Sequence, residues 1–182
     1  MTRSGRQKKP LDARSLQDFA LRYVARYATT RAKLERYLVR KLRECGWDGE
    51  GEPDPAALAG KFAERGWLDD EAYARMRSRD LMARGYGPRR VGEALREAGV
   101  GESIREGQQA GALERARSAV LLARKKRLGP FSTRERDAPL REKQIAAMLR
   151  AGHAFADARR VVDAASEEEL DEWLEEMAEW ED

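Results

Sequence analysis

The sequence predicts an all-α protein, arranged as an elongated, curved array of three tandem three-helix repeats followed by an acidic C-terminal helix. The 182 residues are 41% hydrophobic and 38% charged, with a mean hydropathy of −0.80. Apolar surface is therefore too scarce for one large core, and several small cores fit better. No stretch alternates apolar and polar residues for long enough to predict a strand. A helical segment near the centre also recurs, in weaker form, before and after it.

The central segment runs from Gly66 to Val100 and contains two predicted helices joined by a Gly-Tyr-Gly-Pro turn at 85–88. Aligning Leu95 with Leu38 and with Leu149 brings the basic runs before them into register. The offsets are 57 and 54 residues, which suits a unit of about three short helices. We therefore divide the chain into a disordered basic tail at 1–10, repeats at 11–65, 66–110 and 111–165, and a C-terminal helix at 166–182.

The first repeat is expected to hold three helices. Along a first segment, apolar residues recur at steps of three and one, which is the period of a buried helix face. A second apolar stripe of this kind runs from Leu34 to Cys45. Asp54 and Pro55 mark the start of the third helix, because proline is favoured at the first helical position. The polar, glycine-rich segment 46–53 predicts a loop. The first stripe comprises Leu16, Phe19, Ala20, Tyr23, Val24 and Tyr27.

Start signals place the remaining helices. Asp69 or Asp70 caps the fourth helix, and Gly87-Pro88 opens the fifth. Further helices are predicted at about 111–127, 138–150 and 154–164, with a loop at 128–138. Ser166 and Glu169 form a capping box for the last helix. Its apolar face comprises Leu170, Trp173, Leu174, Met177 and Trp180.

Positive charge is concentrated on one predicted helix face of each repeat. Residues 1–45 contain thirteen Lys/Arg and four Asp/Glu, whereas 166–182 contain ten acidic residues and no basic one. An extended cationic track suits an anionic partner, since each neutralised phosphate releases counterions; the alternative for any single stripe is an ordinary solvated face. Candidate residues are Arg31, Lys33, Arg36, Arg40 and Arg43 in the first repeat, Arg89, Arg90 and Arg96 in the second, and Lys125, Lys126, Arg141 and Lys143 in the third, where Arg124, Arg127 and Arg150 share the face.

Residues suited to catalysis or metal binding are scarce. One histidine, His153, and one cysteine, Cys45, cannot supply a usual metal site or a nucleophile and base pair. We expect Cys45 to be a small packed side chain and His153 to contact carbonyl groups at a helix end. No glycine-rich phosphate loop is present. The chain is therefore expected to be neither an enzyme nor a cofactor-binding protein.

The sequence favours a cytoplasmic monomer without membrane contact. It has no apolar run long enough to cross a bilayer, and the basic start at 1–9 lacks the apolar core of a secretory signal. One cysteine permits no intramolecular disulfide.

Three motifs in the central segment are distinctive enough to compare with known families. They are Gly-Trp-Leu-Asp-Asp-Glu-x-Tyr-Ala at 66–74, Arg-Gly-Tyr-Gly-Pro-Arg-Arg-Val at 84–91 and Leu-Arg-x-x-Gly-Val at 95–100. Together they resemble the RecX family of small bacterial regulators of the RecA recombinase. The resemblance extends to 27–38 and 144–158, and so covers about residues 16–163.

This resemblance implies a negative regulator of homologous recombination, DNA repair and the SOS response. Such a protein binds the RecA filament on single-stranded DNA and inhibits ATP hydrolysis, strand exchange and repressor cleavage. The motifs carry a binding role over to Tyr86, Arg89 and Arg90 in the second repeat. In the first repeat they carry it over to Arg31, Lys33, Arg36 and Arg40.

Two other functions remain open from the residues alone. One is a nonspecific DNA-binding protein that contacts the phosphate backbone and affects recombination indirectly. Weak direct DNA binding would also accompany regulation of the RecA filament. The other is a scaffold that binds proteins through the acidic tryptophan helix. That helix is expected to pack its apolar face on the third repeat, and we hypothesise that it also shields part of the basic track.

Overall fold

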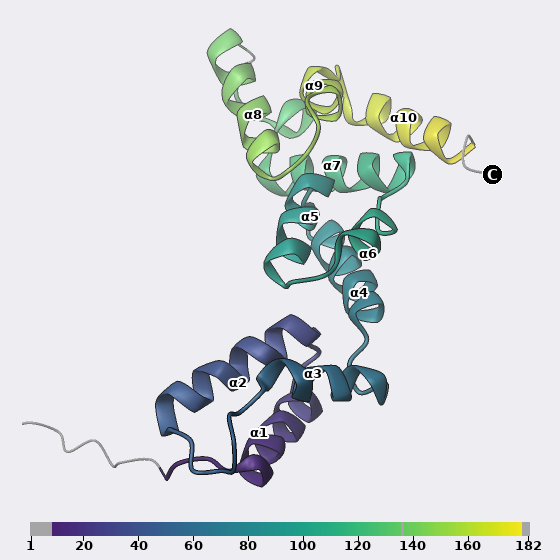
Figure 1. Ribbon diagram of the computed structural model, residues 1–182. Helices are drawn as coiled ribbons and strands as arrows, with labels where there is room; N and C mark the ends of the chain where they lie inside the picture. The colour runs from purple at the N-terminus through teal and green to yellow at the C-terminus, as the bar shows by residue number, and fades with distance from the viewer. Residues whose placement is uncertain (1–8, 136, 180–182) are drawn as a thin grey trace, which may run out of the picture. The chain divides into compact units, whose positions relative to one another are not determined.

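The computed structural model describes residues 9–135 and 137–179 of the protein (Figure 1). Those residues form ten α-helices and one short 3₁₀ helix, and none of them lies in a β-strand. The only strand-like pairing among them is an isolated bridge between Leu11 and Trp47. The all-α prediction is confirmed. No helix in this part of the chain is long and apolar enough to cross a bilayer.

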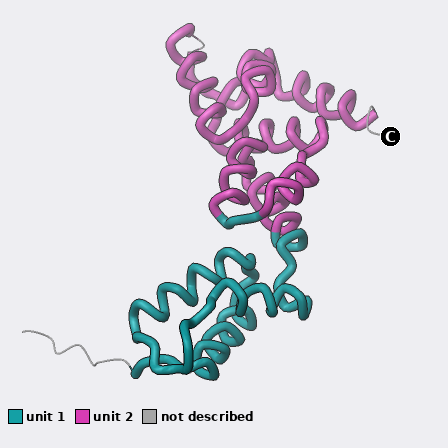
Figure 2. The backbone as a smooth tube through the Cα atoms, viewed as in Figure 1, with its two compact units in different colours: residues 1–73, 98–100 teal, residues 74–97, 101–182 magenta. Residues whose placement is uncertain are grey.

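The chain divides into two compact units (Figure 2). Unit 1 comprises the chain up to Tyr73 together with Ala98–Val100, and unit 2 comprises Ala74–Glu97 together with the chain from Gly101 onward. The borders of the three predicted repeats stay a prediction. Most of the predicted basic tail, residues 1–8, lies outside the described residues.

Unit 1 contains helices α1 (Ala13–Arg26), α2 (Arg31–Cys45) and α3 (Pro55–Glu64). Each begins at a residue whose side chain accepts a free N–H of the first turn, which stabilises the helix start. Asp12 accepts from the N–H of Ser15, Thr30 from that of Lys33 and Asp54 from that of Ala57. The predicted start of the third helix is confirmed.

The core of unit 1 confirms most of the two predicted apolar stripes. Its fully buried side chains are those of Ala20, Leu34, Leu38, Ala59 and Phe62, and partly buried residues that include Cys45 pack against them. The prediction is wrong for Tyr27, which is 50% exposed. The first helix ends at Arg26, and Tyr27 has extended backbone angles (φ −131°, ψ 128°), so its ring no longer follows the helical stripe.

The predicted loop at 46–53 is fastened to the segment before α1. The N–H of Leu11 donates to the carbonyl of Gly46 (3.0 Å), and that of Asp48 donates to the carbonyl of Leu11 (2.8 Å). The indole Nε1 of Trp47 donates to the carbonyl of Gly51 (2.9 Å). These bonds satisfy backbone groups that no helix would pair.

Later elements follow the predicted order. They are α4 (Asp70–Ala83), α5 (Pro88–Glu97), α6 (Glu102–Glu106), α7 (Ala112–Lys126), the 3₁₀ helix η1 (Gly129–Phe131), α8 (Ala138–Arg150), α9 (Phe155–Asp163) and α10 (Glu167–Glu179). Predicted helices correspond to α7, α8 and α9 within about one residue at each end. The short α6 was not predicted, and η1 lies inside the segment predicted as a loop.

Acidic and hydroxyl side chains cap the helices as predicted, with one variation. Asp69 caps α4, since its carboxylate accepts the N–H of Ala72 at 2.7 Å. Ser166 accepts the N–H of Glu169 at 3.3 Å. The carboxylate of Glu169 reaches back to the N–H of Ala165 (2.7 Å), one residue earlier than in an ordinary capping box.

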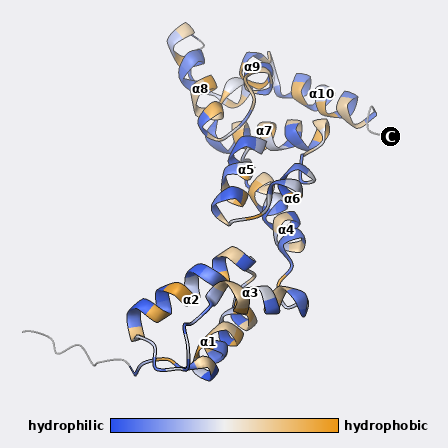
Figure 3. Ribbon diagram, viewed as in Figure 1, coloured by the Kyte–Doolittle hydropathy of each residue, from blue (hydrophilic) through white to orange (hydrophobic). Residues whose placement is uncertain are grey.

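Unit 2 is held together by a core drawn from α7 to α10. Leu170, Met148 and Val161 are fully buried there, and Trp173 and Leu174 pack against the same cluster. The apolar face of the last helix therefore packs on the unit as predicted, and Trp180 lies outside the described residues. In Figure 3 the helices show hydrophobic and hydrophilic residues in alternation, as expected for helices with one buried face.

Candidate partner-binding surface

A cationic face lies on α2 of unit 1. Arg31, Arg36, Arg40 and Arg43 are all exposed there. Arg40 Nε lies 3.7 Å from a carboxylate oxygen of Glu44, and its guanidinium lies 5.4 Å from the centre of the Tyr37 ring. Exposed ion pairs of this kind are weak, so Arg40 remains available to an anionic partner. We call Arg31, Arg36, Arg40 and Arg43 the α2 cationic face.

Lys33 differs from its neighbours on α2 because it is half-buried. Its ammonium donates to the hydroxyl of Tyr73 and lies 4.6 Å from the centre of that ring. At the same end of α2, the carboxylate of Asp70 accepts the N–H of Arg31 (3.0 Å). A carboxylate at a helix N-terminus is stabilising. Asp70, Tyr73 and Lys33 therefore fix the start of α2 within unit 1.

The glycine turn, Gly85 to Pro88, is packed backbone to backbone in unit 2. The N–H of Gly87 donates to the carbonyl of Ala151 (2.9 Å), and that of Arg89 donates to the carbonyl of Gly152 (3.1 Å). A Cβ added to Gly87 would lie 2.3 Å from the carbonyl carbon of Gly152. Only glycine fits so close an approach. The motif that carries the family resemblance most strongly therefore forms an internal joint.

Two candidate arginines flank this joint. Arg89 Nη2 donates to the carbonyl of Leu149 (3.3 Å), at the end of α8. Arg89 and Arg90 both approach Glu93, at 3.6 Å and 3.4 Å. Tyr86 is 37% exposed. Tyr86 and Arg90 thus present surface to a partner, whereas Arg89 is also used to hold α5 against the end of α8.

His153 contacts the same turn. Its Nε2 lies 3.0 Å from the carbonyl oxygen of Gly85, just beyond the end of α4, and both atoms are buried. The expected contact with carbonyls at a helix end is confirmed, although the helix is a different one. Burial lowers the pKa of His153, an effect that the Gly85 carbonyl and Asp157 oppose. In the part of the chain that is described, no group of three or more His, Cys, Asp or Glu could hold a metal ion.

Two candidates from the third predicted repeat have partners in unit 2. Arg141 forms a bidentate pair with Asp163, at 2.5 Å from Nε and 2.6 Å from Nη2. This contact raises the pKa of Arg141 and lowers that of Asp163. Lys125 Nζ donates to the carbonyl of Arg84 (3.4 Å). Both side chains therefore link elements within the unit, and Arg96 is exposed on α5.

Lys126 and Lys143 meet at a hollow of about 500 Å³. Arg127 and Arg134 line it as well, with Ser132 among the polar groups. None of these four cations forms an ion pair with any described residue. Arg134 was not among the candidates, although cations on both sides of the 128–138 segment could have indicated it. We call Lys126, Arg127, Arg134 and Lys143 the basic hollow.

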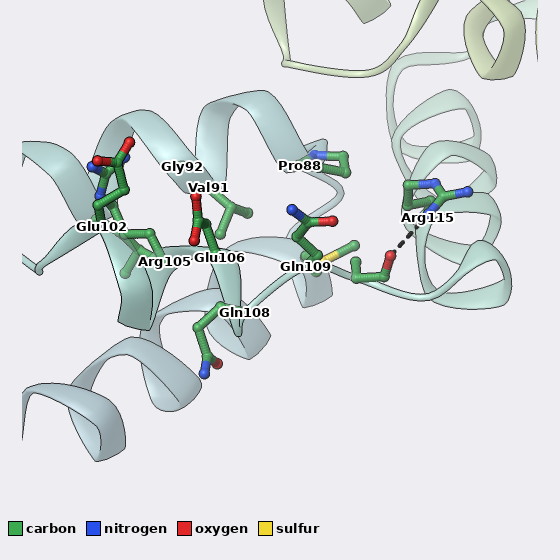
Figure 4. Close-up of a pocket in the computed structure, with 12 residues that line it drawn as sticks. Pro88, Val91, Gly92, Glu102, Arg105, Glu106, Gln108, Gln109 and Arg115 are labelled. Atoms are coloured by element: carbon green, nitrogen blue, oxygen red, sulfur yellow. Dashed lines mark hydrogen bonds between the residues drawn. The ribbon is translucent and has the colours of Figure 1, made fainter.

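A second hollow, of about 340 Å³, lies beside α5 and α6 (Figure 4). Its polar walls carry both signs of charge, from Glu102 and Glu106 and from Arg105 and Arg115. The guanidinium of Arg115 donates to the carbonyl of Ala110 (2.9 Å). No candidate residue lines this hollow, and its mixed charge does not favour an anion.

A third hollow, of about 360 Å³, lies between α1 and α2. The apolar periodicity predicts that all three of its tyrosines, Tyr23, Tyr27 and Tyr37, are buried, and it indicates no function for them. The missing signal was the end of α1 at Arg26, which turns Tyr27 out of the buried stripe. The lining residues are Arg22, Tyr23, Arg26, Tyr27, Tyr37, Arg40 and Lys41.

Comparison with known proteins gives a consistent result. A model of the second three-helix domain of RecX matches residues 69–106, a range that includes the glycine turn. Regulatory protein RecX of Myxococcus xanthus (strain DK1622) is 34% identical over 161 residues, which cover 82% of this chain and 84% of that protein.

Two solved structures share the fold. The crystal structure of RecX from Lactobacillus salivarius matches with a TM-score of 0.64 and 21% identity, over 87% of this chain and 96% of that chain. A crystal structure of regulatory protein RecX matches with a TM-score of 0.67 and 22% identity, over 83% and 73% respectively.

Proposed function

The chain belongs to the RecX family, and on this premise we propose that it regulates the RecA recombinase by binding the RecA filament on single-stranded DNA. Binding lowers ATP hydrolysis, strand exchange and repressor cleavage, so the protein restrains recombination and the SOS response. It acts as a cytoplasmic monomer of three helical repeats. The observation that supports this proposal most is 34% identity to a regulatory protein over most of both chains. Membership in a family of regulatory proteins also agrees with the expectation that the chain is not an enzyme.

The α2 cationic face is the contact we propose first. Its arginines are exposed on one regular helix, so they can meet phosphates or carboxylates without any rearrangement of the fold. In unit 2, Tyr86, Arg90 and Arg96 are exposed around α5 and form a second proposed contact. Lys33, Arg89, Lys125 and Arg141 support it from within, because each already contacts a neighbouring element of its own unit.

The proposal is tested by RecA-catalysed ATP hydrolysis on single-stranded DNA. The wild-type protein at substoichiometric amounts should inhibit hydrolysis, and a variant with Arg31, Arg40 and Arg43 changed to Ala should inhibit at least about tenfold less effectively, since each lost charge weakens an anionic contact. The matched control removes three exposed arginines elsewhere, Arg14, Arg79 and Arg117. Equal loss in both variants would make net charge, not the α2 cationic face, responsible; no inhibition by the wild type would reject the proposed function.

A second function, nonspecific binding to the phosphate backbone of DNA, is favoured by the basic hollow, whose cations have no ion-pair partner among the described residues. Salt separates the two functions. Backbone binding falls steeply with salt because it releases counterions, whereas contacts with filament protein are screened less where they are buried. Inhibition of RecA that persists at a salt concentration where the protein no longer binds naked DNA favours the filament, and parallel loss favours the backbone.

A further inference from the structure

The hollow between α1 and α2 is built from stacked tyrosines. The rings of Tyr23 and Tyr37 stack face to face, with centres 4.2 Å apart and planes inclined by 15°. Tyr27 lies 5.3 Å from Tyr23, inclined by 50°. Tyr23 and Tyr37 are partly buried against the core of unit 1, whereas Tyr27 is half exposed. Two tyrosines therefore close the space between the helices, and the third presents a free ring surface beside them.

Cations surround these rings. The guanidinium of Arg26 lies 5.5 Å from the centre of the Tyr27 ring, and that of Arg40 lies 5.4 Å from the centre of the Tyr37 ring. Arg22 is exposed on the preceding turn of α1. Neither Arg22 nor Arg26 forms an ion pair with a described residue. Their charges are therefore not used to hold unit 1 together.

The fold does not need the exposed ring of Tyr27. α1 has already ended at Arg26, and the Tyr23–Tyr37 stack supplies the apolar contact between α1 and α2. Tyr27 is half exposed and is not among the residues packed against the core of unit 1, so the core depends on it less than on Tyr23 and Tyr37. An aromatic surface edged by unpaired cations is what proteins use to bind single strands, because a base stacks on the ring while cations contact the phosphates. The volume, about 360 Å³, lies in the ~300–1,000 Å³ range of ligand pockets.

We propose that this tyrosine cleft (Arg22, Tyr23, Arg26, Tyr27, Tyr37, Arg40 and Lys41) binds an unpaired nucleobase of single-stranded nucleic acid. The base stacks on Tyr27, and Arg22 and Arg26 contact the adjacent phosphates. Stacking needs an unpaired base, so duplex DNA is a poor ligand. The site acts without RecA, and its test is independent of the proposed function.

Fluorescence anisotropy with the full-length protein, without RecA, tests the stacking contact. The probes are a labelled oligothymidine and an abasic strand with the same number of phosphates. Tyr27→Ala should weaken oligothymidine binding at least about fivefold, the lower end of base–aromatic stacking, and should leave binding to the abasic strand unchanged. Tyr27→Phe keeps the ring and should keep the affinity. Phe155→Ala is the matched control, because Phe155 is an exposed aromatic residue (58%) outside the cleft.

The phosphate contacts have a separate readout. Changing Arg22 and Arg26 to Ala should weaken binding to both strands and reduce the slope of log K against log salt by about 0.7 for each lost phosphate contact. Arg14→Ala with Arg79→Ala removes the same charge from residues that do not line the cleft and should change the slope less. Circular dichroism of every variant should match the wild type, since none of the four arginines has an ion-pair partner among the described residues.

Three results would overturn the proposal. They are equal oligothymidine affinity of Tyr27→Ala and the wild type, an equal loss on the abasic strand, and displacement of the strand by free thymidine monophosphate at the same phosphate concentration. The last result would assign the cleft to a mononucleotide. RecA inhibition measured on Tyr27→Ala keeps the two proposals apart, because loss of strand binding with normal inhibition leaves the proposed function intact.

Discussion

The imidazole Nε2 of His153 lies 3.0 Å from the carbonyl oxygen of Gly85, and this bond joins the end of one helix to the start of another through buried groups. Nε2 must carry the proton to donate to a carbonyl. The other ring nitrogen, Nδ1, is buried and makes no hydrogen bond with any described residue. A second proton there would place a charge in a buried site, and the nearby carboxylate of Asp157 offsets that cost only in part. The neutral ring is therefore the form that the fold stabilises.

Acid should destabilise unit 2 through His153. Burial lowers the folded-state pKa of this group below the ordinary histidine value of 6.5, so the unfolded chain binds the extra proton first. Stability is complete above pH 6.5 and falls as the pH drops from there toward the lowered pKa. His153→Gln keeps an N–H donor without this titration. Chemical unfolding at pH 7.5 and 5.5 should show a smaller loss for the variant, and equal losses would contradict the assignment.

Two glycines on neighbouring turns should respond in opposite ways to alanine. Gly87→Ala places a Cβ 2.3 Å from the carbonyl carbon of Gly152 and should destabilise the protein by about 1–3 kcal/mol through overpacking. Gly92 lies within α5, and an added Cβ meets nothing within 4 Å. Gly92→Ala should stabilise by about 0.5–1 kcal/mol through helix propensity. Thermal unfolding measures both, and similar effects would show that the turn tolerates a side chain.

The backbone conformation of Arg127 should lower the free energy of unfolding. It ends α7 in the left-handed conformation (φ 54°, ψ 54°) and is the only described non-glycine residue with positive φ. Arg127→Gly should raise the free energy of unfolding by about 1 kcal/mol, because glycine adopts this conformation without strain. Arg127→Ala removes the same charge and keeps the strain, so it should not stabilise. If the basic hollow binds phosphate, both variants should bind single-stranded DNA less tightly, which would separate the function of the residue from its effect on folding.

Arg141 should prove more important for the fold than for a partner. Its bidentate pair with Asp163 joins α8 to the end of α9. Arg141→Ala should lower the thermal midpoint, and Asp163→Asn should lower it as well while leaving the arginine charge in place. Inhibition of RecA by Asp163→Asn should equal that of the wild type. A partner contact by Arg141 would instead show as lost inhibition in Arg141→Ala at temperatures where both variants are folded.

Carboxylates on α10 should weaken binding of anionic ligands. Glu167 and Glu169 approach Arg124 (3.8 Å) and Arg160 (3.6 Å), whereas Glu172, Glu175 and Glu176 are exposed. Changing the last three to Gln should tighten binding to single-stranded DNA several-fold at low salt, and the gain should vanish near 1 M salt, where the Debye length is about 3 Å. Substitution is preferable to deletion of the helix, because Leu170 is fully buried. Unchanged affinity at low salt would remove the shielding hypothesis.

Local signals were sufficient to predict most of the helices. Asp54 before Pro55 and Ser166 before Glu169 define helix starts through contacts within three residues, which a sequence shows directly. The short α6 was missed because its five residues, none of them fully buried, are too few to show an apolar period. Tyr27 was misplaced because periodicity does not indicate where the helix ends.

The candidate surface was harder to predict, since the role of a cation depends on residues far away in the chain. Lys33 meets Tyr73, and Arg141 meets Asp163. No spacing rule reveals either pair. The glycine turn was recognised as a motif, but the reason for Gly87 lies at Gly152. A basic stripe in a sequence therefore predicts where positive charge accumulates, and the structure decides which of those charges are already engaged.

The bond between Gly87 and Ala151 also limits how the chain can be divided in the laboratory. A fragment that ends near residue 110 would contain the whole matched region, 69–106, but would lose the carbonyls of Ala151 and Gly152 that pair with the turn. Backbone groups left without these partners would have to be hydrated, and the surface beneath them would open to water. A fragment that keeps the backbone partners of the turn must therefore extend past Gly152. Expression trials and truncation boundaries should be planned around that joint and not around the motif alone.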